Sequence, residues 1–439
     1  MYKHKLSLLL CGLLCSTALL SACSGDKVLP KGTRVSVLDQ ATSIKPDVAK
    51  SADKIQIAGE TSNSSWLQTD MNAQHIMPNA KVGSEFVKQW KSDFGKGSSK
   101  REFLISKPLI KDQIVYTLDA DAELRAFSIK DGEKLWSVEL MSSNRRVSDT
   151  AIKGAGLAAD GNELYVTTGF GVVVAVNAKD GSKLWEQDIH APLRIAPTIA
   201  GNKVFVQSVD NKFFALDKSS GEVLWDYDIA MEETTMVGGA VAAYSPKADV
   251  VITGFSNGEI QAFGAAYGSP LWSDFLVANR QAYSSTFLHT IKAAPVVDDQ
   301  TVYVLGSGDI LAALDIYSGN RRWEKEIGGQ QTPFVSGNTL FVVSNNNELI
   351  ALDKANGNVL WSKAIELKGK ASEVLVYAPV ILNSRIVVAL SNGIVHTFDP
   401  KTGNLLNTID LDEKLNSAPI AADGYIIFTT SNAKLLAYK

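Results

Sequence analysis

The chain repeats one short pattern at a regular spacing, and this repeat constrains its fold more than any other feature. The stretch IALDKANGNVLW begins at Ile350, and FALDKSSGEVLW begins at Phe214. Related stretches are VAVNAKDGSKLW at 174–185, AALDIYSGNRRW at 312–323, RAFSIKDGEKLW at 125–136, QAFGAAYGSPLW at 261–272 and HTFDPKTGNLLN at 396–407. A recurrence every 20–50 residues or so is typical of solenoids, propellers and other arrays of one structural unit.

Each copy keeps the same internal spacing, which predicts a β-hairpin. Ala215 and Trp225 are ten residues apart, and Gly221 stands four positions before the Trp. Gly adopts the positive φ that ends a tight turn without steric cost. An Asp or Asn at the turn entrance can accept hydrogen bonds from backbone N–H groups further along the turn. The residues at this position are Asp217, Asp315, Asp353, Asp399 and Asn177.

A second pair of strands precedes each hairpin. The run VFVQSVDNKFFALD at 204–217 reads as strand, turn and strand, and a short apolar run after a Pro, such as APVVDD at 294–299, comes before such pairs. Pro is tolerated at the first residue of a strand. The period ranges from 38 residues (Trp323 to Trp361) to 51 residues (Trp272 to Trp323). Four antiparallel strands in each period fit a β-propeller blade.

The sequence therefore predicts an all-β fold, an eight-bladed β-propeller of four-stranded antiparallel blades. Helical repeats are disfavoured because these segments alternate with period two and are rich in Val, Ile, Phe and Tyr. SEFVKQW at 84–90 lacks three preceding strands, and the chain ends three strands after its last hairpin, so we expect 84–90 to pair with 434–439 and close the ring. The expected wedges between blades are Trp90, Trp136, Trp185, Trp225, Trp272, Trp323, Trp361 and, more weakly, Asn407.

The N-terminus has the features of a secretory signal peptide. Lys3 and Lys5 precede an almost wholly apolar run that ends at Leu20. Leu20-Ser21-Ala22-Cys23 resembles a bacterial lipobox, whose cleavage leaves a Cys that carries lipid. Cys23 would be the one cysteine left in the mature chain, and acylation explains it, since no internal disulfide can then form. An ordinary signal peptide with an incidental Cys is the alternative.

The lipobox resemblance also implies a location. Ser24 stands where an Asp typically retains lipoproteins in the inner membrane, so the anchor is expected in the outer membrane, facing the periplasm. Stable anchoring needs more than one acyl chain, which a triacylated Cys supplies. We expect a signal peptide at 1–22, the lipidated Cys and a flexible tether at 23–60, and the propeller at 61–439. Within a Trp-to-His lead-in at 64–75, Trp66 and His75 are expected to be packed rather than functional.

The recurring A-x-D-x-x-x-G-x-x-x-W pattern resembles the pyrroloquinoline-quinone (PQQ) propeller repeat, also called the tryptophan-docking motif. With the lipobox, the tether and the eight-blade length, the chain is similar to a family of outer-membrane lipoproteins in the machinery that folds β-barrels into that membrane. The resemblance implies a non-enzymatic scaffold with no cofactor, metal or catalytic residue. It implies binding to the barrel-forming subunit, with nascent outer-membrane proteins as a further partner.

The chain departs from this family where the resemblance places partner contacts. One family loop carries apolar residues followed by Arg; here it reads IAMEETTMVGGA at 229–240, with Met236 as the candidate contact and Val237 in place of Arg. A second loop carries two acidic residues; here it reads FLHTIKAAP at 287–295, with Thr290 and Lys292 at those places. The charge pairing with the partner must therefore differ: either the partner has changed with this chain, or this protein docks differently. Ordinary loop packing is the alternative interpretation of Met236.

Two other classes of function were weighed. A PQQ-dependent dehydrogenase usually needs a Ca²⁺ site, a catalytic Asp and often a vicinal Cys pair, and the sequence has no Cys pair and no C-x-x-C-H haem motif. The five His lack zinc-site spacing. A periplasmic propeller that binds glycans or peptides remains open, because the long loop at 272–292 could carry such a site.

Charge supplies little further information about partners. The net charge of −4 gives no basic footprint for nucleic acid. Arg145 and Arg146 form a paired basic site on a long loop, and a solvated loop is the simpler interpretation of it.

Overall fold

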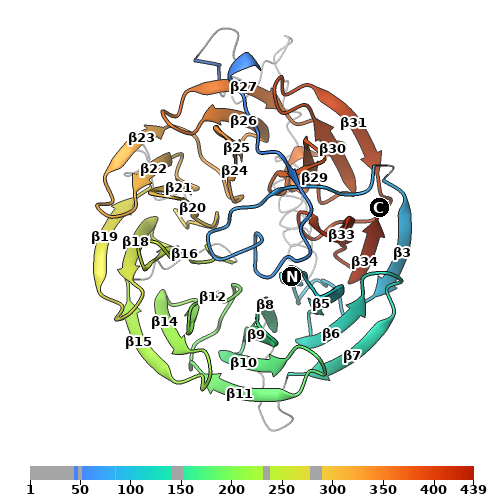
Figure 1. Cartoon of the computed structure of the whole chain (residues 1–439), viewed down its shortest axis with the longest axis vertical. Helices are drawn as coiled ribbons and strands as arrows, with labels where there is room; N and C mark the ends of the chain where they lie inside the picture. The colour runs from blue at the N-terminus through green and yellow to red at the C-terminus, as the bar shows by residue number, and fades with distance from the viewer. Residues whose placement is uncertain (1–43, 48–51, 85, 141–151, 231–237, 277–288) are drawn as a thin grey trace, which may run out of the picture. The chain divides into compact units, whose positions relative to one another are not determined.

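Eight antiparallel sheets follow one another around a ring in the computed structural model (Figure 1). The structure describes residues 44–47, 52–84, 86–140, 152–230, 238–276 and 289–439. Seven sheets have four strands, and the eighth has four strands plus two short ones from the N-terminal segment. This confirms the predicted all-β, eight-bladed propeller. The predicted sites Cys23, Met236, Val237, Arg145 and Arg146 lie outside the described residues.

The blades are numbered in chain order, and their strands run from the inside of the ring to its rim. Blades 1 to 4 consist of β4 (Leu109–Lys111), β5 (Ile114–Leu118), β6 (Glu123–Ser128) and β7 (Lys134–Glu139); β8 (Gly154–Asp160), β9 (Glu163–Thr168), β10 (Val172–Asn177) and β11 (Lys183–Asp188); β12 (Thr198–Ala200), β13 (Lys203–Gln207), β14 (Lys212–Asp217) and β15 (Val223–Asp228); and β16 (Ala243–Ser245), β17 (Val250–Gly254), β18 (Glu259–Gly264) and β19 (Pro270–Phe275).

Blades 5 to 8 repeat this order. They consist of β20 (Val296–Asp298), β21 (Thr301–Leu305), β22 (Leu311–Asp315) and β23 (Arg321–Lys325); β24 (Phe334–Ser336), β25 (Thr339–Val343), β26 (Glu348–Asp353) and β27 (Val359–Ala364); β28 (Val380–Leu382), β29 (Arg385–Ala389), β30 (Ile394–Phe398) and β31 (Leu405–Asp410); and β32 (Ile420–Ala422), β33 (Tyr425–Thr429), β34 (Lys434–Tyr438) and β3 (Lys88–Asp93). A 3-10 turn, η3 (Ala371–Glu373), precedes blade 7.

The apolar core lies between neighbouring blades. Leu124 of blade 1 packs in one cluster with Val166 and Val174 of blade 2. Phe205 and Phe263 share another cluster between blades 3 and 4. Each sheet therefore buries both of its faces, which no blade could do alone.

Seven turn glycines lie against Trp rings of the preceding blade. A Cβ atom added to Gly221 would stand 2.5 Å from Cε3 of Trp185, and one added to Gly357 would stand 2.6 Å from Cε3 of Trp323. Both glycines also have positive φ, +78° and +71°. The turn and the indole ring thus both require Gly at this position. The other pairs are Gly132–Trp90, Gly181–Trp136, Gly268–Trp225, Gly319–Trp272 and Gly403–Trp361.

The small residue of each repeat stands opposite the Trp within one hairpin. Ala215 is paired with Trp225, and the register shifts by one residue directly after Ala215. Such a bulge increases the local twist. At the turn entrance, Oδ1 of Asp217 accepts hydrogen bonds from the N–H groups of Ser219 at 2.9 Å and Ser220 at 3.0 Å. The ten-residue spacing is therefore the length of one hairpin with a fixed turn and bulge.

Most of the Trp side chains also donate a hydrogen bond to the next blade. Trp185 Nε1 donates to the Lys218 carbonyl at 2.9 Å, and Trp90, Trp225, Trp272, Trp323 and Trp361 make equivalent bonds. Within the described residues, Trp136 Nε1 has no acceptor. The Ala178 carbonyl, at the equivalent place, accepts the Tyr116 hydroxyl instead. Asn407 is exposed, and its side-chain oxygen accepts only from the next residue's N–H, so it does not reproduce the Trp contact.

The strand from the start of the propeller joins the last three strands. β3 pairs with β34, with Lys88 opposite Tyr438 and Asp93 opposite Lys434. The paired strand begins at Lys88, later than the expected 84–90, because Phe86 has a φ of +50° that interrupts the extended geometry. The Phe86 ring stacks on Tyr438 with centroids 4.6 Å apart.

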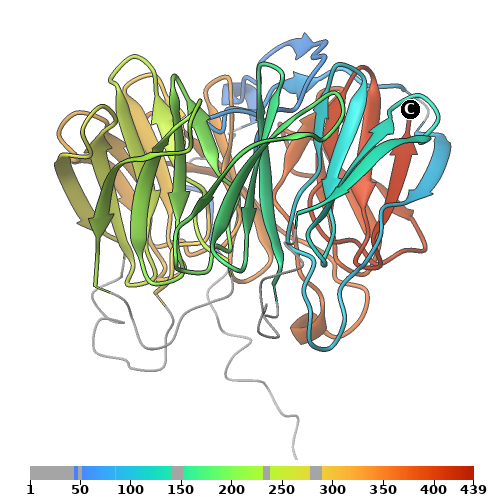
Figure 2. The same ribbon diagram turned by 90° about the horizontal axis from the view of Figure 1, so that it is seen from below.

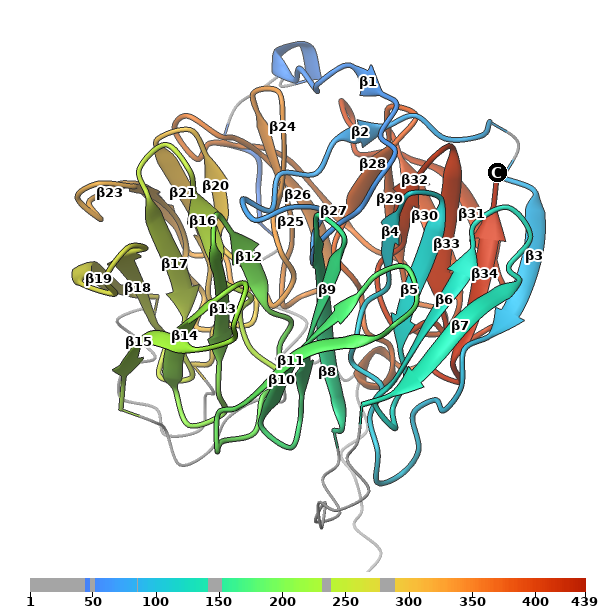
Figure 3. The same ribbon diagram turned by 60° about the horizontal axis from the view of Figure 1, so that its bottom comes forward.

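Residues 52–83, which we call the strap, cross the ring at one end of the blades (Figures 1 and 2). The strap begins with η2 (Ala52–Lys54), and its β1 (Glu60–Thr61) and β2 (Asn79–Ala80) lie beside β28 (Figure 3). It is hydrogen-bonded to, or paired with, the first strand of every blade. The contacted residues are Ile110, Ala159, Ile199, Tyr244, Val297, Ser336, Leu382 and Ala421, from blades 1 to 8 in order.

Residues before position 61 already contact the blades. The Asp47 N–H donates to Val359 O at 2.9 Å, and the Gln56 carbonyl accepts from the Asn338 N–H. Side chains add to both contacts, because Asp47 Oδ2 accepts from the Val359 N–H and Asn338 Oδ1 accepts from the Gln56 N–H.

Buried polar groups hold the middle of the strap. Asp70 accepts from Lys107 Nζ at 2.9 Å and from Thr332 Oγ1 at 2.6 Å, and His75 Nδ1 lies 2.7 Å from the Pro295 carbonyl. Burial lowers the pKa of His75 even though Asp70 opposes the shift. Burial favours a raised pKa for Asp70, but Lys107, His75 and Thr332 together lower it. His75 is buried, as the sequence predicts, and so is Trp66.

Substitution of a glycine that lies against a Trp ring should lower the free energy of unfolding by more than backbone strain alone would. Gly357→Ala places a methyl group against Trp323 at a positive φ, whereas Gly161 has a φ of +54° with nothing within 4 Å. We expect Gly161→Ala to lower the free energy of unfolding by about 1–2 kcal/mol. Gly357→Ala should cost about 1–3 kcal/mol more because of overpacking. Urea unfolding of both variants tests this, and equal losses would show that the Trp contact does not matter.

Acid should loosen the strap through His75. Its folded-state pKa is depressed, so the unfolded chain binds the proton first. The stability that neutral His75 contributes is present above its ordinary pKa of 6.5 and is lost below it, at up to about 1.4 kcal/mol per pH unit. We expect His75→Asn, which tolerates the φ of +60°, to lose less stability between about pH 7.5 and 5.5 than wild type.

The control for this measurement is His190→Asn. His190 has a similar φ of +61°, but its side chain is 84% exposed. Its variant should keep the pH dependence of the wild type in urea unfolding. An unchanged pH dependence in His75→Asn would refute the assignment.

Candidate partner-binding site

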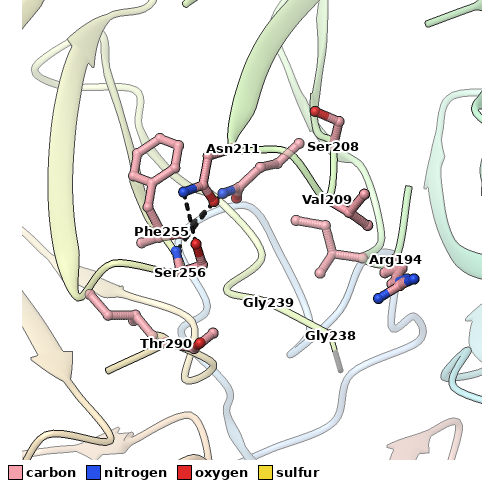
Figure 4. Close-up of a pocket in the computed structure, with 13 residues that line it drawn as sticks. Arg194, Ser208, Val209, Asn211, Gly238, Gly239, Phe255, Ser256 and Thr290 are labelled. Atoms are coloured by element: carbon pink, nitrogen blue, oxygen red, sulfur yellow. Dashed lines mark hydrogen bonds between the residues drawn. The ribbon is translucent and has the colours of Figure 1, made fainter. Parts of the chain in front are cut away.

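A recess lies at the end of the strands opposite the strap, where the turns of blades 3 and 4 meet (Figure 4). β13 runs away from the strap end at Lys203 towards this recess at Gln207. The recess is open to solvent, and the empty space in and at the mouth of it is about 420 Å³. Its lining comes from three connections between blades and two turns within blades, at 194–195, 238–239 and 290–291, and at 207–211 and 254–256.

Asn211 ties these turns together. Its side-chain nitrogen donates to the Ser256 hydroxyl at 2.8 Å and to the Ala230 carbonyl at 3.0 Å, and its side-chain oxygen accepts from the Ser256 N–H at 3.3 Å. Asn211 is 2% exposed and has a φ of +63°, which Asn tolerates better than most residues. One amide therefore links a turn of blade 3, a turn of blade 4 and the chain between these blades.

Gln207 makes a second link across the same blades. Its side-chain nitrogen donates to the Gly254 carbonyl at 3.2 Å, and its oxygen accepts from Thr253 Oγ1 at 3.1 Å. Because these amides are satisfied by protein groups, the recess keeps its shape without a ligand. A binding site held in this way loses little entropy when a partner docks.

Two cationic side chains give the recess its charge. Arg194 lines it, and Cε of Lys292 would lie 3.8 Å from a Cβ added to the lining residue Gly238. Burial lowers the pKa of the Lys292 ammonium. No ion pair to Lys292 or Arg194 is found in the described part of the chain. Asp210, in the neighbouring turn, accepts the Ser208 hydroxyl.

The structure brings together the ends of the two loops that the resemblance assigns to partner contacts. Gly238 and Gly239, which directly follow Met236 and Val237, lie in the recess with Thr290, and Lys292 lies beside it. Sequence reasoning missed Arg194 and Asn211. Arg194 stands in a blade connection, and Asn211 stands in an ordinary turn, so no motif marked either residue.

Few other groups suggest chemistry. In the described ranges, no group of three or more His, Cys, Asp or Glu residues is arranged to hold a metal ion. His396 is buried between the Thr408 hydroxyl and the Glu366 carbonyl, each at 2.9 Å. Over the same ranges, no helix has the length and apolar character needed to cross a membrane.

Removal of the Asn211 amide should destabilise the recess. Asn211→Ala leaves the Ser256 and Ala230 groups unpaired, and we expect a loss of about 2 kcal/mol in the free energy of unfolding. Asn347 is the matched control, because it occupies the equivalent turn of blade 6 with a φ of +57° and makes no side-chain hydrogen bond to another described residue. Guanidinium unfolding that gives the same loss for Asn347→Ala would contradict the role of the amide.

Several sequence relatives of the chain are described as BamB, and others are described as uncharacterized proteins. The chain is 26% identical over 271 residues to the outer membrane protein assembly factor BamB of Yersinia pestis, a match that covers 61% of this chain and 68% of that protein. It is 25% identical over 322 residues to the BamB protein of Escherichia coli strain K12, which covers 73% of this chain and 80% of that protein.

Solved structures show the same fold. BamB from Moraxella catarrhalis superposes with a TM-score of 0.66 at 17% identity and covers 80% of this chain and 100% of its own. A europium-containing methanol dehydrogenase superposes with a TM-score of 0.67 at 14% identity, over 84% of this chain and 89% of its own. At such low sequence identities, the structural similarity supports a shared propeller fold and does not indicate a shared activity.

One protein-family profile matches two long stretches of the chain. The profile described as "Outer membrane protein assembly factor BamB" matches residues 63–152 and 142–363, which is more than half of the chain. The chain therefore belongs to the BamB family of outer membrane protein assembly factors.

Proposed function

We propose that this protein is a non-enzymatic scaffold subunit of the outer-membrane β-barrel assembly machinery. It binds the barrel-forming subunit and aids the folding and insertion of outer-membrane proteins. The observation that carries the proposal is the recess, where Gly238 and Thr290 bring the two loops of the family's partner surface together. Membership of the BamB family and relatives that bear this description support the same function.

The chemistry of the strap favours a scaffold over a dehydrogenase. The buried carboxylate of Asp70 accepts hydrogen bonds from Lys107 and Thr332, and the buried His75 is hydrogen-bonded to a backbone carbonyl. A general base needs access to the proton that it removes. These groups serve the attachment of the strap, which explains why they are buried without any catalytic role.

Exposed outer strands at the rim of the ring favour nascent outer-membrane proteins as a second partner. Leu224 and Leu271 on the outer strands β15 and β19 are 46% and 50% exposed, whereas the equivalent Leu360 on β27 is 3% exposed. Asp47 bonds to Val359 of β27 through both its backbone N–H and its side chain. The chain itself thus places a segment on one outer strand, and unpaired outer strands can accept an extended peptide in this way.

Purification from the native envelope tests the proposal. The tagged, lipidated protein, extracted in mild detergent, should recover the barrel-forming subunit, identified by mass spectrometry, together with unfolded outer-membrane proteins. Recovery of the protein alone, or with a periplasmic redox chain, would overturn the scaffold function and favour the glycan-binding or dehydrogenase alternatives.

The anchor is tested in the same cells. We propose that Cys23 carries the lipid and holds the protein in the outer membrane, facing the periplasm. Labelling with radioactive palmitate should mark the wild type and not Cys23→Ser, and fractionation should place only the wild type in the outer membrane. Equal labelling of both chains would contradict a lipid on Cys23.

A further inference from the structure

We propose that the recess binds an acidic side chain of the barrel-forming subunit, an Asp or Glu carboxylate, between Lys292 and Arg194. The inference rests on the proposed function and adds to it the charge of the partner at this contact. It concerns the described residues of the recess alone.

The first argument is the cost of a buried, unpaired cation. Lys292 is half-buried, and its pKa is depressed by burial alone. A charge that loses water without gaining an opposite charge destabilises the free protein. Proteins retain such groups mainly where a ligand or partner supplies the missing charge. Within the described chain, no carboxylate does so.

The second argument is geometry. Lys292 comes from the connection into blade 5, and Arg194 comes from the connection into blade 3; the lining residue Gly238, in the connection into blade 4, lies next to Lys292. The Arg fork can bind a carboxylate through two parallel hydrogen bonds, and the Lys ammonium acts as a compact point charge. The Asn211 and Gln207 amides hold the neighbouring turns, so this part of the recess wall is formed before binding.

The third argument is the sign of the charge at positions where this sequence departs from the family resemblance. The family resemblance expects acidic residues where this chain has Thr290 and Lys292, and an Arg where it has Val237. By that resemblance, Lys292 places a positive charge where an acidic residue is expected. Complementary interfaces require opposite charges, so the partner's group facing Lys292 should be acidic.

The experiment measures affinity between the full-length protein in detergent and the periplasmic domains of the barrel-forming subunit from the same genome. Lys292→Met keeps the apolar stem and removes the charge, and Arg194→Gln keeps hydrogen bonding. We expect each variant to weaken binding by about ten-fold at low salt, with a smaller difference at high salt because screening removes the charge term. Thermal unfolding of each variant reports whether it is folded.

Lys247→Met is the matched control. Lys247 lies in blade 4, at the strap end of the same strands, and is ion-paired with Asp299. Its variant should bind like the wild type. A reversal, Lys292→Glu, should be rescued by an Asp→Lys or Glu→Lys change in the partner's domains, which would identify the contacting residue.

The outcomes separate the two proposals. Absence of binding by the wild type would overturn the proposed function. Binding by the wild type with unchanged affinity in Lys292→Met and Arg194→Gln would overturn the carboxylate site and leave the scaffold intact. Lys292-dependent binding to phosphatidylglycerol vesicles, and not to the partner's domains, would show that the recess binds a lipid phosphate. That result would also overturn the carboxylate site.

A further variant tests the chain's own acids. Glu232→Gln combined with Glu233→Gln changes the two carboxylates that stand closest in sequence before Gly238. This variant should bind the partner's domains as tightly as the wild type or more tightly. A loss equal to that of Lys292→Met would show that these carboxylates, and not the partner's, act with the recess.

Discussion

The contact between an indole ring and a turn glycine joins each of seven blades to the next. Trp185 lies against Gly221, and the same contact recurs around the ring. Its Nε1 group also donates to the next blade's backbone, so one side chain supplies apolar area and a hydrogen bond. The Ala opposite each Trp leaves room for the ring within its own sheet. All other features, including the recess, depend on blades held at this spacing.

The strap gives the two ends of the ring different properties. It is hydrogen-bonded to, or paired with, the first strand of all eight blades, and its buried Asp70 and His75 link it to groups that precede blades 1, 5 and 6. The opposite end carries the connections between blades, whose length and composition can vary without disturbing the docking contacts. Binding residues are therefore expected at that end.

The recess shows how a repeat protein obtains a unique site. The docking positions repeat, but Asn211, Arg194 and Lys292 do not belong to the motif. The two cations stand in blade connections, where each blade differs from the next. A scaffold function suits this arrangement, since binding needs a firm surface of defined charge and no reacting group. The propeller shared with dehydrogenases supplies the framework, and the connections determine what it binds.

The structure of one blade could be predicted from the amino-acid sequence. The ten-residue spacing, the turn glycines and the terminal half-blades predicted four-stranded units, their number and the pairing of the first strand with the last, because these features depend on contacts within one repeat or on a simple count. The family resemblance also indicated the loops at 229–240 and 287–295, which contain Gly238 and Thr290. The remaining features depend on the folded ring. Several of the strap's bonds join groups more than 200 residues apart, as between the Gln56 N–H and the Asn338 side-chain oxygen with a separation of 282, and Arg194 and Lys292 reach the recess from different connections. No local sequence pattern predicts these long-range contacts, because they form only when the whole ring closes.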